Sequence, residues 1–318
     1  LIIFCAVSAV LVLSAAAVPW WLGAALEWAG ASRGLKFARY ERLGYSRFAL
    51  HEAEFHHRRV RVTVSRIEAD TPLVAWWRRG EIAVGRWAVE VVGRSEKAAP
   101  QTTAGGWIPL RGTLQGVAAQ LERWAPRVTA QTGMVRWPGA ELAFASALWT
   151  ERTLAVKALS YRELTADATL AFPADALRLA LRGAGGGAIL ESRGGDVKGD
   201  VTWWEQRAKL SARFGERGWL PGEAALQAAD WHVPGEKVRL GAAYAAVRGH
   251  GKIEWREQKL LADFAATGEP VAGRSVPPLA VTLRGQGDAN AFTVESLQAT
   301  LPGIVARLSE AVTVERSG

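Results

Sequence analysis

The side chains that could bind a metal or transfer protons are most concentrated between His51 and His57. A zinc protease places two histidines at positions i and i+4 of one helix. Here the second histidine, His56, comes five residues after the first. We interpret the segment as a strand, with its odd-numbered residues on one face and its even-numbered residues on the other. This pattern favours a solvated strand face, and a metal site using His51 and His57 is the alternative.

Other patterns of catalytic chemistry are weak or missing in the sequence. The glycine-rich stretch 183–188 is not followed by the Lys-Ser/Thr pair of a phosphate-binding loop, so we interpret it as a hairpin turn. The sequence contains no G-x-S-x-G elbow for a nucleophilic serine. His232 and His250 lie among Ala, Trp and Gly without a convergent Ser, Cys or Asp. The chain is therefore predicted not to be an enzyme, and no cofactor or metal is expected.

The composition is that of a folded protein with an anionic partner. Charged residues make up 22% and aromatic residues 9% of the chain, which excludes a disordered tail. The formal net charge of +8 suits nucleic acid or lipid headgroups. The basic residues are spread through alternating segments and form no Lys/Arg block, so a lipid surface is favoured over nucleic acid. The sequence has a single cysteine, Cys5, so no disulfide can form within it.

Residues 1–26 contain no charged side chain. A helix needs about 20 apolar residues to cross a bilayer, so this run predicts a transmembrane signal anchor. Trp20 and Trp21 lie near its end, where an interfacial aromatic belt is expected. A cleaved signal peptide is the alternative, because Ser14 to Ala17 could form a cleavage site.

Residues 27–150 are predicted to form an N-terminal α+β cap. Val60, Val62 and Val64 recur with the period of a strand. Residues 94–106 show no periodicity and are expected to be a loop. Residues 114–125 carry apolar side chains with helical spacing, and Pro126 is expected to end this helix.

Residues 151–318 alternate between apolar and polar positions in segments separated by glycine and proline turns. Strand-like segments with such turns begin near Val128, and they predict that the fold after the anchor is mostly β, with an extended, curved antiparallel sheet rather than a βαβ fold. Alanine is frequent on the apolar positions although it is a poor strand former. Its small side chain leaves space above the sheet, which favours an open hydrophobic groove or a bound acyl chain. The residues predicted to line this groove are Leu154, Val156, Ala208, Leu210, Ala212, Phe214, Val238, Leu240, Ala242, Leu279, Val281 and Leu283.

The order of these elements resembles a known family. The motif V-x-V-x-x-I-x-x-x-x-P is followed by a tryptophan, Gly-Glu-Ile and Val-Gly-Arg-Trp, and then by a helix ending in Leu-Glu-Arg-Trp-Ala-Pro. These features resemble the N-terminal region of AsmA-like envelope proteins of the TamB and YdbH type. The residues concerned are Val62, Val64, Ile67, Pro72, Trp77, 80–82, 84–87, 121–126 and 133–137.

The resemblance implies a protein anchored in the inner membrane, with a β-groove that crosses the periplasm of a diderm bacterium. It implies transfer of phospholipid between the inner and outer membranes, without catalytic residues. The alternative is an assembly scaffold that helps an outer-membrane β-barrel protein by adding strands to a sheet edge. At 318 residues the chain is too short to bridge a periplasm, so we expect an N-terminal piece of a longer protein.

The charges beside the apolar run conflict with this location. Arg33, Lys36, Arg39 and Arg42 follow the run and by themselves favour a cytoplasmic body. We nevertheless expect residues 27–318 to lie in the periplasm, with further positive residues upstream of Leu1 that hold the N-terminus in the cytoplasm.

Overall fold

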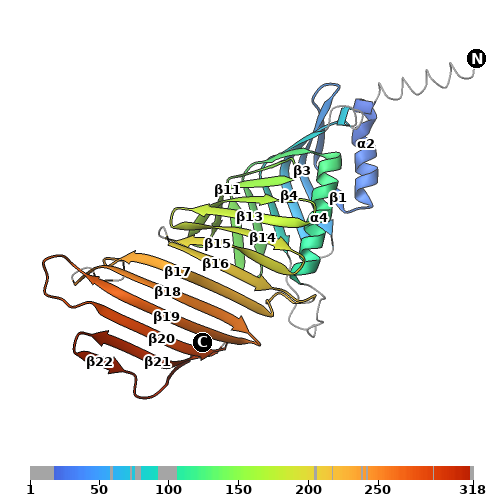
Figure 1. Ribbon diagram of the computed structural model, residues 1–318. Coiled ribbons are helices and arrows are strands. Elements are labelled where there is room, and N and C mark those ends of the chain that lie inside the picture. The colour runs from blue at the N-terminus through green and yellow to red at the C-terminus, as the bar shows by residue number, and fades with distance from the viewer. Residues whose placement is uncertain are drawn as a thin grey trace, which may run out of the picture. The chain divides into compact units, whose positions relative to one another are not determined.

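The computed structural model describes residues 18–57, 60–71, 74–75, 80–91, 106–203, 206–216, 218–237, 239–240, 243–288 and 290–315. Within these ranges the protein is mostly β, as predicted, with 23 strands and the two helices α2 (Val18–Ala31) and α4 (Trp107–Trp124) (Figure 1). No helix in the described ranges is long and apolar enough to cross a membrane. Residues 1–17, which make up most of the predicted anchor, lie outside them.

The chain divides into two compact units. Unit 1 extends to Pro173 without residues 103–112, and unit 2 consists of these ten residues and everything from Ala174. The strands of unit 1 are β1 (Leu35–Lys36), β2 (Arg39–Arg42), β3 (Arg47–His57), β4 (Val60–Asp70), β5 (Glu81–Val84), β6 (Trp87–Val91), β7 (Arg127–Ala130), β8 (Gly133–Trp137), β9 (Ala140–Phe144), β10 (Ser146–Thr150), β11 (Thr153–Tyr161) and β12 (Leu164–Ala171).

The sheet of unit 1 is mixed, so the prediction of a purely antiparallel sheet is wrong here. β5 pairs in parallel with β7, and β6 pairs in parallel with β8, whereas the other strand pairs of this unit are antiparallel. Parallel neighbours need a crossover of a dozen or more residues, usually a helix. The segment from Val91 to Arg127 contains α4 and is long enough to supply it.

A line of irregular residues crosses the sheet of unit 1. Glu52 in β3 and Ala158 in β11 both adopt a left-handed φ of 50°. Between them lie the breaks that separate β5 from β6, β7 from β8, and β9 from β10. An extra residue in one strand shifts the alternation of side chains by one position. Apolar positions are accordingly even-numbered in β5 (Ile82, Val84) and odd-numbered in β6 (Trp87, Val89).

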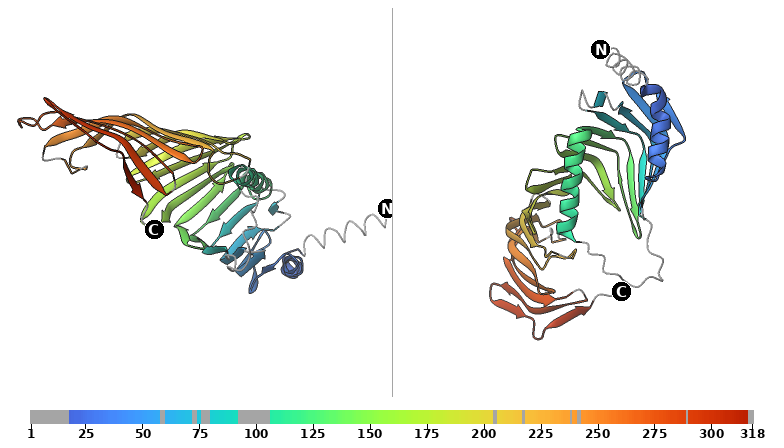
Figure 2. Two further views of the ribbon diagram at one scale, coloured as in Figure 1. Left: turned by 90° about the horizontal axis from the view of Figure 1, so that it is seen from below. Right: turned by 90° about the vertical axis from the view of Figure 1, so that its right-hand side faces the viewer.

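Helix α2 packs against the first strands of unit 1 (Figure 2). Leu22 is buried with Phe48 and Leu50 of β3, and Leu26 and Tyr40 pack around them. A burial of this kind removes several large apolar side chains from water and stabilises the packing. Leu22 and Leu26, the last leucines of the predicted anchor, are therefore part of a protein core.

Helix α4 confirms the helix predicted over 114–125 and begins seven residues earlier, at Trp107. Pro109 lies in its first turn, where a missing N–H is tolerated. The first turn belongs to unit 2. There the indole Nε1 of Trp107 donates a 3.0 Å hydrogen bond to Ser192 Oγ, and its ring packs on Phe214 at 5.7 Å between centroids.

Unit 2 is an antiparallel meander. Its strands are β13 (Ala176–Gly183), β14 (Gly186–Arg193), β15 (Asp196–Trp203), β16 (Gln206–Arg213), β17 (Glu223–Pro234), β18 (Tyr244–Arg256), β19 (Lys259–Pro270), β20 (Leu279–Gly287), β21 (Ala291–Leu301), β22 (Ile304–Arg307) and β23 (Val312–Glu315). From β13 to β21 each strand pairs with the next in the chain, and both β22 and β23 pair with β21 (Figure 1). Two-residue turns join β13 to β14, β14 to β15 and β18 to β19, and such turns pair consecutive strands in antiparallel hairpins.

Candidate functional site

One face of the sheet in unit 2 is apolar from β13 to β21. Residues directly opposite each other in antiparallel strands lie on the same face, so the strand register identifies each row of side chains. The central row is Leu179, Leu190, Gly199, Leu210, Leu226, Ile253, Ala262, Gly285 and Val294. This row contains no polar side chain in nine consecutive strands.

The opposite face of the same strands is charged. Lys209 pairs with Asp200 on β15, and Asp263 pairs with Lys252 and Arg284 on its two neighbours. Arg284 Nε donates a 3.0 Å hydrogen bond to Asp263 Oδ2. Exposed ion pairs of this kind contribute little stability singly. They do oppose a one-residue slip, because such a slip would move every charge to the apolar face.

Aromatic rings on the apolar face lie close to glycines of the neighbouring strand. A Cβ placed on Gly251 of β18 would come within 2.2 Å of Cδ1 of Phe264 on β19. One placed on Gly249 would come within 2.6 Å of the ring of Trp231 on β17. The rings occupy the space that a side chain would fill on the neighbouring strand.

A hollow of about 300 Å³ lies on this face above β15 to β19. It is lined by Trp203, Ala208, Leu226, Ala228, Trp231, Val233, Gly251, Ile253 and Phe264. None of these residues is charged. Leu226, Ile253 and Phe264 are neither buried nor fully exposed, which is the state of an apolar surface that a ligand could cover.

Six of the residues predicted to line a groove lie together on this face. Ala208, Leu210 and Ala212 lie on β16, and Ala208 borders the hollow. Leu279, Val281 and Leu283 lie on β20. Leu283 is directly opposite Phe264, and Val281 is opposite Ala266.

Two further predicted residues belong to unit 1. Leu154 and Val156 lie on β11, opposite Leu170 and Ala168 of β12. On the other side of β11 they pair with Trp149 and Ala147 of β10. They therefore lie in an apolar row of their own unit.

The remaining predicted positions differ from the prediction or lie outside the described ranges. Phe214 follows the end of β16 and packs on Trp107, because the first turn of α4 covers this end of the strand. Leu240 lies in the turn between β17 and β18 and not in a strand, since residues 235–237 already turn after Pro234. Val238, Ala242 and the side chain of Trp20 lie outside the described part of the chain, and Trp21 is 48% exposed on α2.

Sequence reasoning missed the aromatic side chains that border the hollow: Trp203, Trp231 and Phe264. The signal that could have found them is the spacing Gly249-x-Gly251 inside a run of alternating residues. Glycines at two successive positions of one face mark a close approach by neighbouring side chains. The partner of each glycine becomes clear only when the register of β17, β18 and β19 is known.

The histidine segment forms a polar network. His51 Nε2 lies 2.6 Å from Glu41 Oε2, and Arg66 lies 3.8 Å from the same oxygen. The left-handed Glu52 interrupts the strand alternation, so the predicted common face of His51 and Ala53 is wrong. In the described ranges no three His, Cys, Asp or Glu side chains are grouped closely enough to hold a metal ion.

We expect the protein to lose stability as the pH falls below the ordinary carboxyl range. Hydrogen bonds from His51, His56 and Arg193 lower the pKa values of Glu41, Glu54 and Glu191, respectively, from 4.5. A carboxylate with a lowered folded-state pKa stabilises the fold above its unfolded-state pKa, and this contribution is lost as the pH falls through the folded-state value. The melting temperature should therefore decrease when the pH is lowered below 4.5. This decrease should be smaller in Glu41→Gln than in the unsubstituted protein. An equal fall in this variant would contradict the assignment to Glu41.

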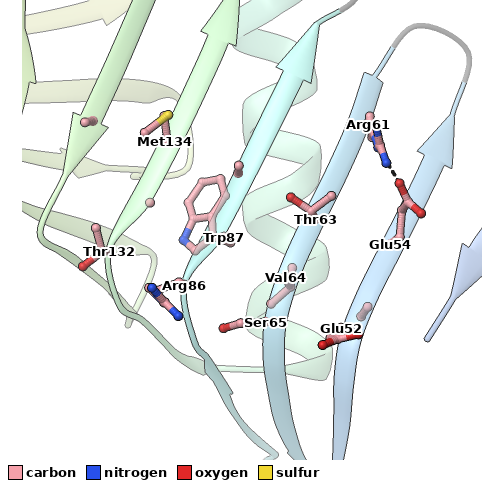
Figure 3. A pocket seen from close by; sticks show the side chains of 14 residues that line it. Glu52, Glu54, Arg61, Thr63, Val64, Ser65, Arg86, Trp87, Thr132 and Met134 are labelled. Carbon is pink, nitrogen blue, oxygen red and sulfur yellow. Dashed lines mark hydrogen bonds and ion pairs between the residues drawn. The ribbon is translucent and has the colours of Figure 1, made fainter. Parts of the chain in front are cut away.

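Unit 1 has a larger and more polar hollow, of about 630 Å³. Its labelled side chains come from β3, β4, β6 and β8 and from the residues just before β6 and β8 (Figure 3). Charged and hydroxyl groups gather there, and Arg61 donates a hydrogen bond to Glu54 across the hairpin. The hollow lies along the line of irregular residues, because Glu52, Arg86 and Thr132 all border it.

Comparisons with protein-family models, with curated proteins and with solved structures found no match to this chain.

Proposed function

We propose that this protein carries phospholipid along the apolar face of its sheet, as a lipid-transfer conduit. In this proposal the chain belongs to an AsmA-like envelope protein of a diderm bacterium. It is anchored in the inner membrane by its apolar N-terminal residues, with its body in the periplasm, and passes lipid between the inner and outer membranes.

The observation that carries the proposal is the apolar face of unit 2. It extends across nine strands, includes a hollow without charged residues, and has a charged face behind it. A chain of methylene groups gains about 0.8 kcal/mol for each CH₂ that it buries. The rings of Trp231 and Phe264 lie close to Gly249 and Gly251, and the central row of the face offers no polar side chain that would hold such a chain at one point. The face thereby acts as an open hydrophobic groove.

Photocrosslinking on two adjacent residues of β16 tests this function. A photoreactive amino acid at Leu210 should capture phospholipid, because Leu210 lies in the central apolar row. The same group at Lys209 should capture none, because Lys209 pairs with Asp200 on the charged face. Mass spectrometry of the purified adducts identifies the captured molecule. Equal capture at the two positions would overturn the proposal.

The edge of unit 2 supports a second candidate, an assembly scaffold. In the described part of the chain, β22 and β23 pair only with β21. Val305 of β22 and Val314 of β23 are 53% and 60% exposed. A free strand edge can add a strand of another protein. Crosslinking of an outer-membrane β-barrel protein at Val305, with no lipid at Leu210, would favour this function over lipid transfer.

A further inference from the structure

Helix α2 is apolar on both sides. Its only charged residue is Glu27. On one side, Leu22 and Leu26 pack into the core of unit 1, and Gly23 comes close to the ring of Tyr40. The other side cannot be explained by this core, because Trp28 is 83% exposed and Trp21 is 48% exposed.

The two exposed tryptophans share one face of the helix. They are seven residues apart, which corresponds to about two turns. The positions between them on this face are Ala24 and Ala25. Tryptophan is enriched at the boundary between lipid and water, where its ring lies at the level of the headgroups.

Cations follow directly after this face. Arg33 and Lys36 are exposed and form no ion pair with any residue in the described ranges. Arg39 is also exposed, at 3.7 Å from Glu41. Each Lys or Arg near an anionic bilayer is attracted to its surface.

We infer that the Trp21–Trp28 face of α2 lies in the headgroup layer of an anionic membrane, with Arg33 and Lys36 at the lipid phosphates. This inference rests on the proposed membrane anchoring and extends it. The burial of Leu22 against Phe48 means that the helix is already part of the protein at this residue, so it no longer crosses the bilayer there. Unit 1 then lies against the membrane along α2, and the first strands of its sheet lie next to the lipid.

Depth measurements with a spin label test this inference. The full chain is placed in nanodiscs that contain phosphatidylglycerol, with Cys5→Ser to remove its only cysteine and a nitroxide on Trp28→Cys. Trp219→Cys is the matched control, since Trp219 is 60% exposed in unit 2. The label at position 28 should collide severalfold more often with oxygen, which concentrates in lipid, than with a water-soluble nickel chelate. The label at position 219 should show the opposite preference.

The charges are tested in the same nanodiscs. Arg33→Gln with Lys36→Gln should lower the oxygen preference at position 28, as should phosphatidylcholine in place of phosphatidylglycerol. If the label at position 28 collides with the nickel chelate as often as the control label does, the inference is wrong. A label shielded from both reagents also overturns it, because a protein partner would then cover the face.

The outcomes are separable from those of the lipid conduit. If position 28 is exposed to water while Leu210 still captures lipid, only the membrane contact of α2 is wrong. If position 28 lies in the headgroup layer while Leu210 captures none, only the conduit is wrong.

Discussion

Replacing Gly251 with valine should strongly destabilise unit 2. Its Cβ would lie 2.2 Å from Cδ1 of Phe264, and Gly251 is itself buried. Phe264 packs beside Gly251 at the border of the hollow, so either its ring must turn away from Gly251 or the two strands must separate. Overpacking of this kind costs about 1–3 kcal/mol. Denaturant unfolding of Gly251→Val should show this loss. Lys252→Val, on the exposed face of the same strand, should change the stability by less than about 0.5 kcal/mol.

A double-mutant cycle shows whether the ring is the cause. In a Phe264→Ala background the space above Gly251 is empty, so adding Gly251→Val should cost much less than it does alone. Residues in contact give coupling energies of about 0.5–3 kcal/mol in such cycles. Additive effects of the two substitutions would mean that Phe264 does not lie over Gly251.

Local periodicity was sufficient to predict much of the sheet. In β16 the apolar residues Ala208, Leu210 and Ala212 alternate with charged or polar ones, and the structure has a strand there. In β20, Val281 and Leu283 likewise alternate with Thr282 and Arg284, and the structure has a strand there. The alternation reflects the burial of one face, so it is visible without any knowledge of the neighbouring strands. The helical spacing from Leu114 to Trp124 is a local signal of the same kind.

Features that depend on distant residues could not be predicted. The parallel pairing of β5 with β7 follows from a crossover through α4, and no residue in either strand encodes it. Glu52 adopts a left-handed conformation that is uncommon for glutamate. The residue type at this position therefore does not predict that the alternation of side chains shifts there. Leu240 continues an alternating pattern in the sequence, yet it lies in the turn between β17 and β18.

The same distinction between local and long-range features applies to the candidate site. Periodicity placed Leu210 and Leu283 on an apolar face, but it could not show that Phe264 covers Gly251, because these residues meet only through the register of β18 and β19. Phe214 fits the pattern of β16, but a helix from an earlier part of the chain packs on it. The rows of apolar side chains could therefore be predicted from the sequence, whereas the hollow could not.

Replacing Leu226 with aspartate should abolish most lipid capture at Leu210. Leu226 is directly opposite Leu210 and borders the hollow. A lipid chain that covers this position would have to remove water from the new carboxylate, and the effective penalty for burying an ion is several kcal/mol. This penalty exceeds the gain from burying several CH₂ groups at about 0.8 kcal/mol each. Because each 1.4 kcal/mol changes an affinity tenfold, capture should fall by at least about tenfold.

Two variants separate this effect from a loss of folding. Gln227→Asp adds the same charge one residue along β17, on the face where Gln227 pairs with Lys209, and should leave lipid capture unchanged. Leu226→Ala removes the same leucine without adding a charge and should retain most of the capture. Thermal unfolding of all three variants shows whether each is folded at the temperature of the crosslinking. If Leu226→Asp is folded and captures as much lipid as the unsubstituted protein, lipid does not pass over the central row, and the apolar face must serve another partner.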